Sequence, residues 1–305
     1  MGTTWTVKFG QSAPPLTPPA VEPPVVARLH QLELIFSTYR ADSELMRFNA
    51  NESTAWFPVS LELARAAVTA REISELTDGA FDVTVDPLVR AWGFGPAGRP
   101  VIFPTAATIA ALRSSVDWRG LMGRLEPPAI RRNRERITVD FSSFAKGLAC
   151  DILSDDLVRL GASDHFLQIG GDVRTRGKAG DGRPWRVGIE EPVEGQRAVS
   201  LVVGLAGQAL STSGDYRNFF TEEGRHLGHI IDPRTGRPVA NELAAVSVIH
   251  DSAATSSAVA TALFVLGLKS GFALAEAQGL ACVFFIRRHG LIEKSMTSAW
   301  AAYQL

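Results

Sequence analysis

The 305-residue sequence predicts an α+β fold in which antiparallel sheets pack against helices. In several segments apolar residues recur every three to four positions, as in amphipathic helices. Short runs of alternating polar and apolar residues, bounded by glycine-rich turns, are typical of antiparallel strands. The elements come in groups, a helix followed by several strands. This order differs from the strict alternation of strand and helix that builds a parallel sheet.

The first predicted element is a strand over residues 4–10, which have the alternating sequence TWTVKFG. Residues 12–24 then contain six prolines. We expect this segment to be an extended connector without helix, because proline lacks the backbone donor that a helix needs. A helix follows over residues 25–36, where apolar side chains return at helical spacing.

Three more helices and one strand are predicted before the middle of the chain. Ser60 is a typical N-cap for a helix that runs to Leu76, before the turn sequence TDG. Residues 105–116 and 143–160 have helical patterns, and Gly161 is well placed to end the second of these. Between them, the sequence RERITVDF (134–141) predicts a strand.

The second half of the chain is predicted to be mainly strands, followed by helices. HFLQIGGDVRTRG, WRVGIEEP, AVSLVVGLAGQALST and AAVSVIH all have strand patterns. A helix is expected from about Ser257 and a second one around residues 270–278, with two closing strands. We expect no apolar run long enough to span a membrane.

Composition narrows the functional classes. Hydrophobic residues make up 46% of the chain and the formal net charge is −1, so a basic surface for nucleic acid is not expected. The two cysteines, Cys150 and Cys282, are too few for a disulfide framework or a zinc cluster, and we expect both in the core. The start of the chain lacks a signal-peptide pattern. We therefore expect a cytoplasmic protein as the chain stands, or a periplasmic one if an export signal was trimmed.

Taken one at a time, the motifs leave alternatives open. The sequence Gly-Gly-Asp at 170–172 is typical of a turn at a strand end, or of a backbone that approaches a ligand closely. STSGDYRNFF (211–220) is either a polar turn or a group of phosphate-binding hydroxyls. Lys146, near a helix start, is either solvated or an anion contact. His229 is one of six histidines and could be purely structural.

In their order along the chain, the motifs resemble one family, the ApbE-type flavin transferases (FAD:protein FMN transferases). The resemblance covers nearly the whole chain. It rests on MGTTWTVKF, TYRADSELMRFN, GAFDVTVDPLVRAWGFG, DFSSFAKGLACD, QIGGDVRTRG, SGDYRNFF, HIIDPRTGRPV and SAVATALFVLG.

The resemblance implies an activity, a cofactor and a partner. Such enzymes cleave the pyrophosphate of FAD, attach FMN through a phosphoester to a Thr or Ser of a target protein, and release AMP. FAD is the substrate and Mg²⁺ the expected cofactor, since it neutralises phosphate oxygens. The acceptor would be a protein such as a subunit of a membrane redox complex. The implied architecture is one domain over residues 1–305, built from two tandem T-fold-like halves, with the proline-rich connector at 12–24.

The resemblance also implies site residues. The FAD contacts would be Met1, Tyr39, Asn49 near the diphosphate, Ala80, Phe81, Asp82, Asp140, Lys146, His229 and Ile230. The metal ligands would be the backbone carbonyl of Ser143 and the side chains of Ser257 and Thr261. His229, Ser257 and Thr261 would form the catalytic set.

One departure from the family pattern concerns the metal. The family has Asp and Thr four residues apart in a DAxAT helix start, and here Ser257 stands at the Asp position. Mg²⁺ prefers carboxylate oxygens, so a serine there should weaken the site. Asp251 or Asp86 could compensate. Three readings follow from this departure: an active Mg²⁺-dependent transferase, a flavin-binding protein without transferase activity, and an FAD pyrophosphatase that uses water as acceptor.

Overall fold

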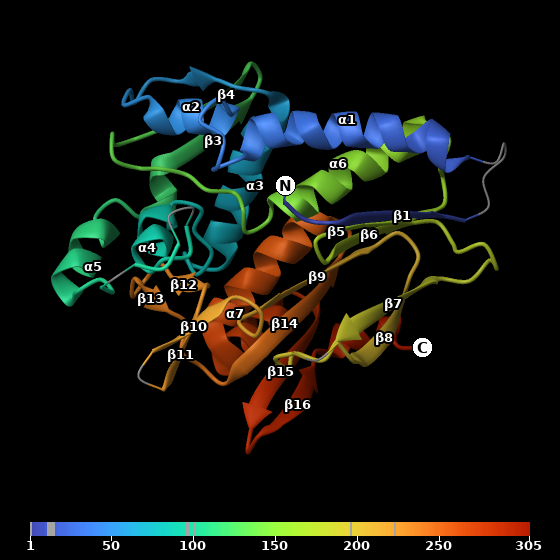
Figure 1. Ribbon diagram of the computed structural model, residues 1–305. Coiled ribbons are helices and arrows are strands. Elements are labelled where there is room, and N and C mark those ends of the chain that lie inside the picture. Colours follow the sequence, from blue (N-terminus) through green and yellow to red (C-terminus); the bar gives the residue numbers. More distant parts are fainter. Residues whose placement is uncertain (1, 11–15, 96–97, 101, 196, 223) are drawn as a thin grey trace. The chain divides into compact units, whose positions relative to one another are not determined.

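The computed structural model describes residues 2–10, 16–95, 98–100, 102–195, 197–222 and 224–305. The chain divides into two compact units, each assembled from segments far apart in the sequence (Figure 1). Unit 1 comprises Met1–Gln31, Phe144–Tyr216 and Glu242–Leu305, and unit 2 comprises Leu32–Ser143 and Arg217–Asn241.

Unit 1 is built on a seven-stranded sheet with the order β1-β5-β6-β9-β14-β15-β16. Every neighbouring pair in it is antiparallel, which confirms the α+β class. The strands are β1 (Trp5–Phe9), β5 (His165–Ile169), β6 (Asp172–Arg176), β9 (Ala209–Gly214), β14 (Leu243–His250), β15 (Ala281–Arg288) and β16 (Leu291–Met296).

Helices cover one face of this sheet. The helix α6 (Ala145–Arg159) packs on β5 and β6, and α7 (Ala253–Ala277) packs on β9 and β14. The two helices also pack on each other, and Gly147 permits this, because an added Cβ would lie 2.3 Å from the carbonyl oxygen of Ala253. The opposite face carries the hairpin of β7 (Trp185–Glu190) and β8 (Val199–Leu205), together with the 3-10 helix Ser298–Tyr303. These elements form an apolar core that includes Val173, Leu210 and Trp300.

Unit 2 is mainly helical. It contains α2 (Glu44–Ala50), α3 (Leu61–Leu76), α4 (Asp86–Ala91), α5 (Ala106–Arg113) and the 3-10 helix Trp118–Gly120. The helix α3 packs on a small antiparallel sheet of β2 (Phe57–Pro58), β4 (Pro128–Arg132) and β3 (Leu121–Leu125). Two further hairpins pair β10 (Phe219–Glu222) with β11 (Arg225–Gly228), and β12 (Ile231–Asp232) with β13 (Arg237–Pro238).

Several sequence expectations are confirmed. Ser60 caps α3 through its side chain, which accepts from the amide of Leu63. The helix expected at 105–116 is α5, which Thr105 caps in the same way, and Gly161 ends α6 with a φ of +96°. Both cysteines are free and buried. Local capping and hydrophobic period therefore specify these elements well.

The prediction of a helix-free connector over residues 12–24 is wrong for the second part of that segment. Residues 11–15 lie outside the described residues, so for them it stays a prediction. The helix α1 runs over Pro18–Phe36 and includes Pro23 and Pro24. Prolines in the first turn cost little because the amides there have no helical partner. Packing outweighs the loss at the two inner prolines, since Val21 and Val25, one turn apart, are both buried.

The strand expected at 134–141 is also wrong. Ile137, Val139 and Phe141 do alternate into the core, as the pattern indicates. Their segment nevertheless joins no sheet. Instead the side chain of Asn49 bonds both the N–H and the C=O of Val139, at 2.9 and 2.8 Å, and Asp140 donates its amide to Val83. The side-chain amide of Asn49 thus makes the backbone hydrogen bonds that a neighbouring strand would otherwise make.

The last predicted helices form one element with a bend. Gly267 has non-helical angles (φ 75°, ψ 175°) that divide α7, close to the predicted division. Contrary to expectation, α7 is by length and hydropathy (1.8 over 18 residues) apolar enough to cross a membrane. This is weak support for a membrane span, because 56% of that stretch is buried inside the protein, where α7 packs on the sheet.

Candidate active site

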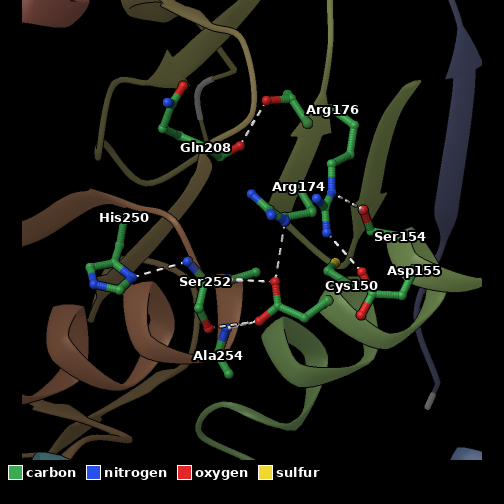
Figure 2. Close-up of polar contacts among 12 residues, drawn as sticks. Cys150, Ser154, Asp155, Arg174, Arg176, Gln208, His250, Ser252 and Ala254 are labelled. Carbon is green, nitrogen blue, oxygen red and sulfur yellow. Dashed lines mark hydrogen bonds and ion pairs between the residues drawn. The ribbon is translucent and has the colours of Figure 1, made fainter. Parts of the chain in front are cut away.

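The start of α7 is fixed by the carboxylate of Asp151 on α6. Its two oxygens accept from the Ser252 hydroxyl at 2.8 Å and from the amides of Ala253 and Ala254 at 2.9 and 3.0 Å. Arg174 on β6 places its Nε 3.4 Å from the same carboxylate. Figure 2 shows that Arg174, Ser252 and Ala254, the partners of this carboxylate, lie close together. A capping carboxylate of this kind satisfies the free amides of the first turn and interacts favourably with the helix dipole.

Ser257 and Thr261 follow on the next turns of α7 and face the sheet, as their spacing predicts. The hydroxyl of Thr261 lies 2.9 Å from that of Ser213 on β9, and it donates to the carbonyl of Ser257 across 3.1 Å. Ser257 is buried, with 5% of its surface exposed. Its hydroxyl donates to Oδ2 of Asp172 at 3.4 Å.

Asp172 is the functional candidate that the sequence reasoning missed. It begins β6 and is only 5% exposed. Its neighbour Val173 belongs to the apolar core on the far face of the sheet, so strand alternation directs Asp172 towards the helices. Burial raises the pKa of the Asp172 carboxyl, and Lys146, Ser211 and Ser257 oppose that shift. The only signal in the sequence was an acidic residue directly after two glycines.

Ser211 on β9 lies on the same side as Asp172. Leu210, its neighbour, points into the core of the opposite face. The Ser211 hydroxyl is fully buried and makes no hydrogen bond within the described part of the chain. Together with Ser213, Ser257 and Thr261 it forms a hydroxyl-lined seat between β9 and α7, which has the Asp172 carboxylate at its edge.

Lys146, in the first turn of α6, supplies the positive charge of unit 1 near this seat. The β5–β6 turn passes close to its side chain. A Cβ on Gly170 would lie 2.9 Å from the Lys146 Cδ, and Gly170 has a φ of +56°. Glycine is therefore favoured at this turn mainly by its positive φ, which residues with side chains rarely adopt.

In unit 2, Asp82 is buried and fully bonded. Its carboxylate accepts from the amide and the hydroxyl of Thr84, both at 2.7 Å, and from the amide of Trp118 at 3.1 Å. Burial raises its pKa to about 6, against the lowering effect of these bonds. Ala80 and Phe81 beside it are also buried. The three predicted flavin contacts therefore form one well-ordered turn.

Asp140 and Asn49 lie on the neighbouring extended segment of unit 2. The backbone of Asp140 bonds Val83, next to Asp82, and burial raises the pKa of its carboxyl. Asn49 uses both atoms of its amide on Val139, so in this structure its side chain supports the backbone. Tyr39 is 78% exposed.

His229 and Ile230 follow β11. The His229 Nδ1 lies 3.1 Å from the carbonyl of Asn218, which fixes the ring, and the ring meets Phe94 edge-on with centroids 6.3 Å apart. Ile230 is buried, and its carbonyl accepts from Val239. Ser143 is half-buried in the turn before α6. Met1, another predicted contact, lies outside the described residues.

Comparisons with known proteins decide the family. The sequence profile of the ApbE family matches residues 1–284. This chain belongs to the ApbE family. It is 37% identical to the FAD:protein FMN transferase of Vibrio cholerae, over 94% of this chain and 85% of that one. The corresponding Haemophilus influenzae protein is 36% identical, with 98% and 88% covered.

Solved structures of ApbE proteins are also similar to the structure of this chain. The flavin transferase ApbE from Vibrio cholerae has a TM-score of 0.90 and 35% identity, covering 99% of this chain and 96% of that one. The apo form of Pseudomonas stutzeri flavinyl transferase ApbE has a TM-score of 0.89 and 36% identity, with 99% and 93% covered. The fold is therefore an ApbE fold.

Whether the residues of this ApbE protein fit Mg²⁺ can be judged from the donor set. No group of three His, Cys, Asp or Glu side chains capable of holding a metal occurs among the described residues. The seat on α7 instead offers several hydroxyls and the single carboxylate of Asp172. Mg²⁺ takes oxygen ligands and is often held by one or two carboxylates plus substrate phosphates. The donor set fits such a site.

Proposed function

We propose that this protein is an FAD:protein FMN transferase that cleaves the pyrophosphate of FAD, attaches FMN to a Thr or Ser hydroxyl of an acceptor protein and releases AMP. The observation that carries the proposal is the match over 94% of the chain to a relative of that name. The α7 seat supports it, because a group of hydroxyls beside a buried carboxylate suits a hydrated Mg²⁺ bound to phosphate.

The chain's own residues would bind and position the reactants. Asp172, Ser257 and Thr261 would hold Mg²⁺, which when bound neutralises phosphate oxygens and orients the attack. Lys146 would add positive charge near the diphosphate. The turn at Ala80–Asp82 would hold the flavin end of FAD through its buried, ordered backbone.

His229 would act on the proton of the acceptor hydroxyl. Its ring is oriented by the bond from Nδ1 to Asn218, and a neutral imidazole held in one orientation suits general-base work. The acceptor would be a flavin-carrying subunit of a membrane redox complex.

The test is a transfer assay with the intact protein. Incubation with FAD, Mg²⁺ and an acceptor domain should add one FMN group to the acceptor, detected by mass, and release one AMP for each group transferred. An acceptor with its target Thr changed to Val, and a reaction with EDTA, serve as controls. AMP release without a modified acceptor would identify an FAD pyrophosphatase. FAD binding with neither product would identify a flavin-binding protein.

A further inference from the structure

We propose that in this chain the carboxylate ligand of the divalent cation is Asp172 on β6, which replaces the one that the helix α7 lacks at Ser257. The inference rests on the proposed function, since it concerns the metal of that reaction. It assigns a new role to a residue on a different element, on the sheet instead of the helix.

The state of the Asp172 carboxylate carries the argument. It is more deeply buried than Asp151, yet the bond that it receives from a side chain, from Ser257, is 3.4 Å long. The Ser211 hydroxyl is buried and close enough to lower the pKa of the carboxyl, yet no partner lies within hydrogen-bond distance of it among the described residues. Buried carboxylates are normally paired or hydrogen-bonded, because leaving one without partners is destabilising. A cation in this seat would satisfy both groups.

Lys146 does not serve as the cation that satisfies the Asp172 carboxylate. It influences Asp172 electrostatically, but the two form no ion pair within 4.0 Å in the part of the chain described. The Lys146 ammonium sits on a flexible stem and suits an anionic phosphate as well as a carboxylate. Asp172 therefore keeps an oxygen for another partner.

The two carboxylates that the sequence suggested as substitutes are less suited. Asp251 is exposed in the loop before α7. Asp86 pairs with Arg90 at 2.7 Å on its own helix. Asp151 is near α7 but uses both oxygens on the helix start and on Arg174.

The serine at 257 follows from the same geometry. A carboxylate at 257 would stand beside that of Asp172, because the two side chains are already within hydrogen-bond reach. Two such neighbouring negative charges repel unless the cation is bound. With Asp172 and Ser257 the seat keeps one negative charge, and that charge lies on the sheet instead of on the helix.

The experiment measures Mn²⁺ binding by the electron paramagnetic resonance signal of the free ion, with and without FAD. The wild type should bind Mn²⁺. Asp172→Asn should weaken binding at least about tenfold, as expected for a lost charged ligand. The double variant Asp172→Asn/Ser257→Asp should regain most of the affinity, because it restores the carboxylate on the helix. Asp251→Asn is the matched control and should bind like the wild type.

Unfolding of each variant without metal shows whether it is folded. Wild-type affinity in folded Asp172→Asn overturns the inference, as does a wild type that binds no Mn²⁺ with or without FAD. Failure of the double variant to regain binding overturns it too, since the loss would then reflect damage to the seat. If Mn²⁺ binding follows these expectations but no FMN reaches an acceptor, the proposed function fails and the metal assignment holds. If FMN transfer has the same metal dependence in Asp172→Asn and wild type, only the metal assignment fails.

Discussion

Two carboxylates approach the same helix in unit 1, and they differ in how they are used. Asp151, with 23% of its side chain exposed, accepts three hydrogen bonds at the start of α7 and lies 3.4 Å from Arg174. Asp172 is more deeply buried, at 5% exposed, and receives one long bond from Ser257. The more buried carboxylate therefore accepts fewer hydrogen bonds at normal distances.

This contrast distinguishes a carboxylate that is buried to stabilise the fold from one that is buried to bind a ligand. A carboxylate that stabilises the fold gathers donors, because each donor offsets part of its desolvation. A carboxylate that awaits a cation keeps lone pairs free, at a cost to stability. Asp151 follows the first pattern and Asp172 the second. Removing Asp151 should therefore mainly lower stability, whereas removing Asp172 should mainly weaken cation binding.

The largest expected effect is on stability. Asp151→Ala should lower the free energy of unfolding by about 3 kcal/mol, because the start of α7 loses its cap and the buried Arg174 loses its partner. Asp172→Ala should cost no more than about 1 kcal/mol, since little bonding is lost. Urea unfolding without metal measures both. Equal losses would mean that the two carboxylates are alike in function.

A buried but bonded carboxylate in unit 2 extends the comparison to pH. The pKa of Asp82 is raised to about 6 in the folded protein, so between about pH 4 and 6 the folded state binds more protons than the unfolded state. Stability from this group is therefore present at low pH and is lost as pH rises through 6. At roughly 1.4 kcal/mol per pKa unit, the loss is on the order of 3 kcal/mol.

Asp82→Asn isolates this effect. The difference in unfolding free energy between wild type and variant should shift against the wild type by up to about 3 kcal/mol from pH 4 to pH 7. Asp78→Asn is the control on the same turn, because the Asp78 side chain is 97% exposed and should leave the pH profile unchanged. A pH-independent difference for Asp82→Asn would show that the carboxyl titrates normally.

Sequence and structure agree where the specifying interactions are local. The cap at Ser60 and the i, i+4 pair Ser257 and Thr261 were predictable, because neighbours in the sequence determine them. Asp172 was not, since its role depends on β6 lying beside β9 and facing α7. The same holds for the segment around Val139, whose alternation predicts a strand, while the partner of its backbone is the distant side chain of Asn49.

The smallest expected effects come from two buried serines, Ser256 within α7 and Ser211 on β9. Ser256 donates to the carbonyl of Val248 at 2.7 Å, whereas the equally buried Ser211 makes no hydrogen bond within the described residues. Ser256→Ala should cost about 1 kcal/mol of stability, and Ser211→Ala should be neutral within about 0.5 kcal/mol, because no partner lies within hydrogen-bond distance of its hydroxyl in the described residues.

Metal binding should reverse the order of these two variants. Ser211→Ala should weaken Mn²⁺ binding a few-fold, since its hydroxyl lies near Asp172. Ser256→Ala should leave Mn²⁺ binding unchanged, because the Ser256 hydroxyl already donates to a carbonyl of β14. Unfolding curves and the free Mn²⁺ signal measure the two effects on the same samples. A Ser211→Ala variant that loses stability and keeps its affinity would place this hydroxyl among the structural groups, with Asp151. The cation would then be held by Asp172 and the hydroxyls of α7 alone.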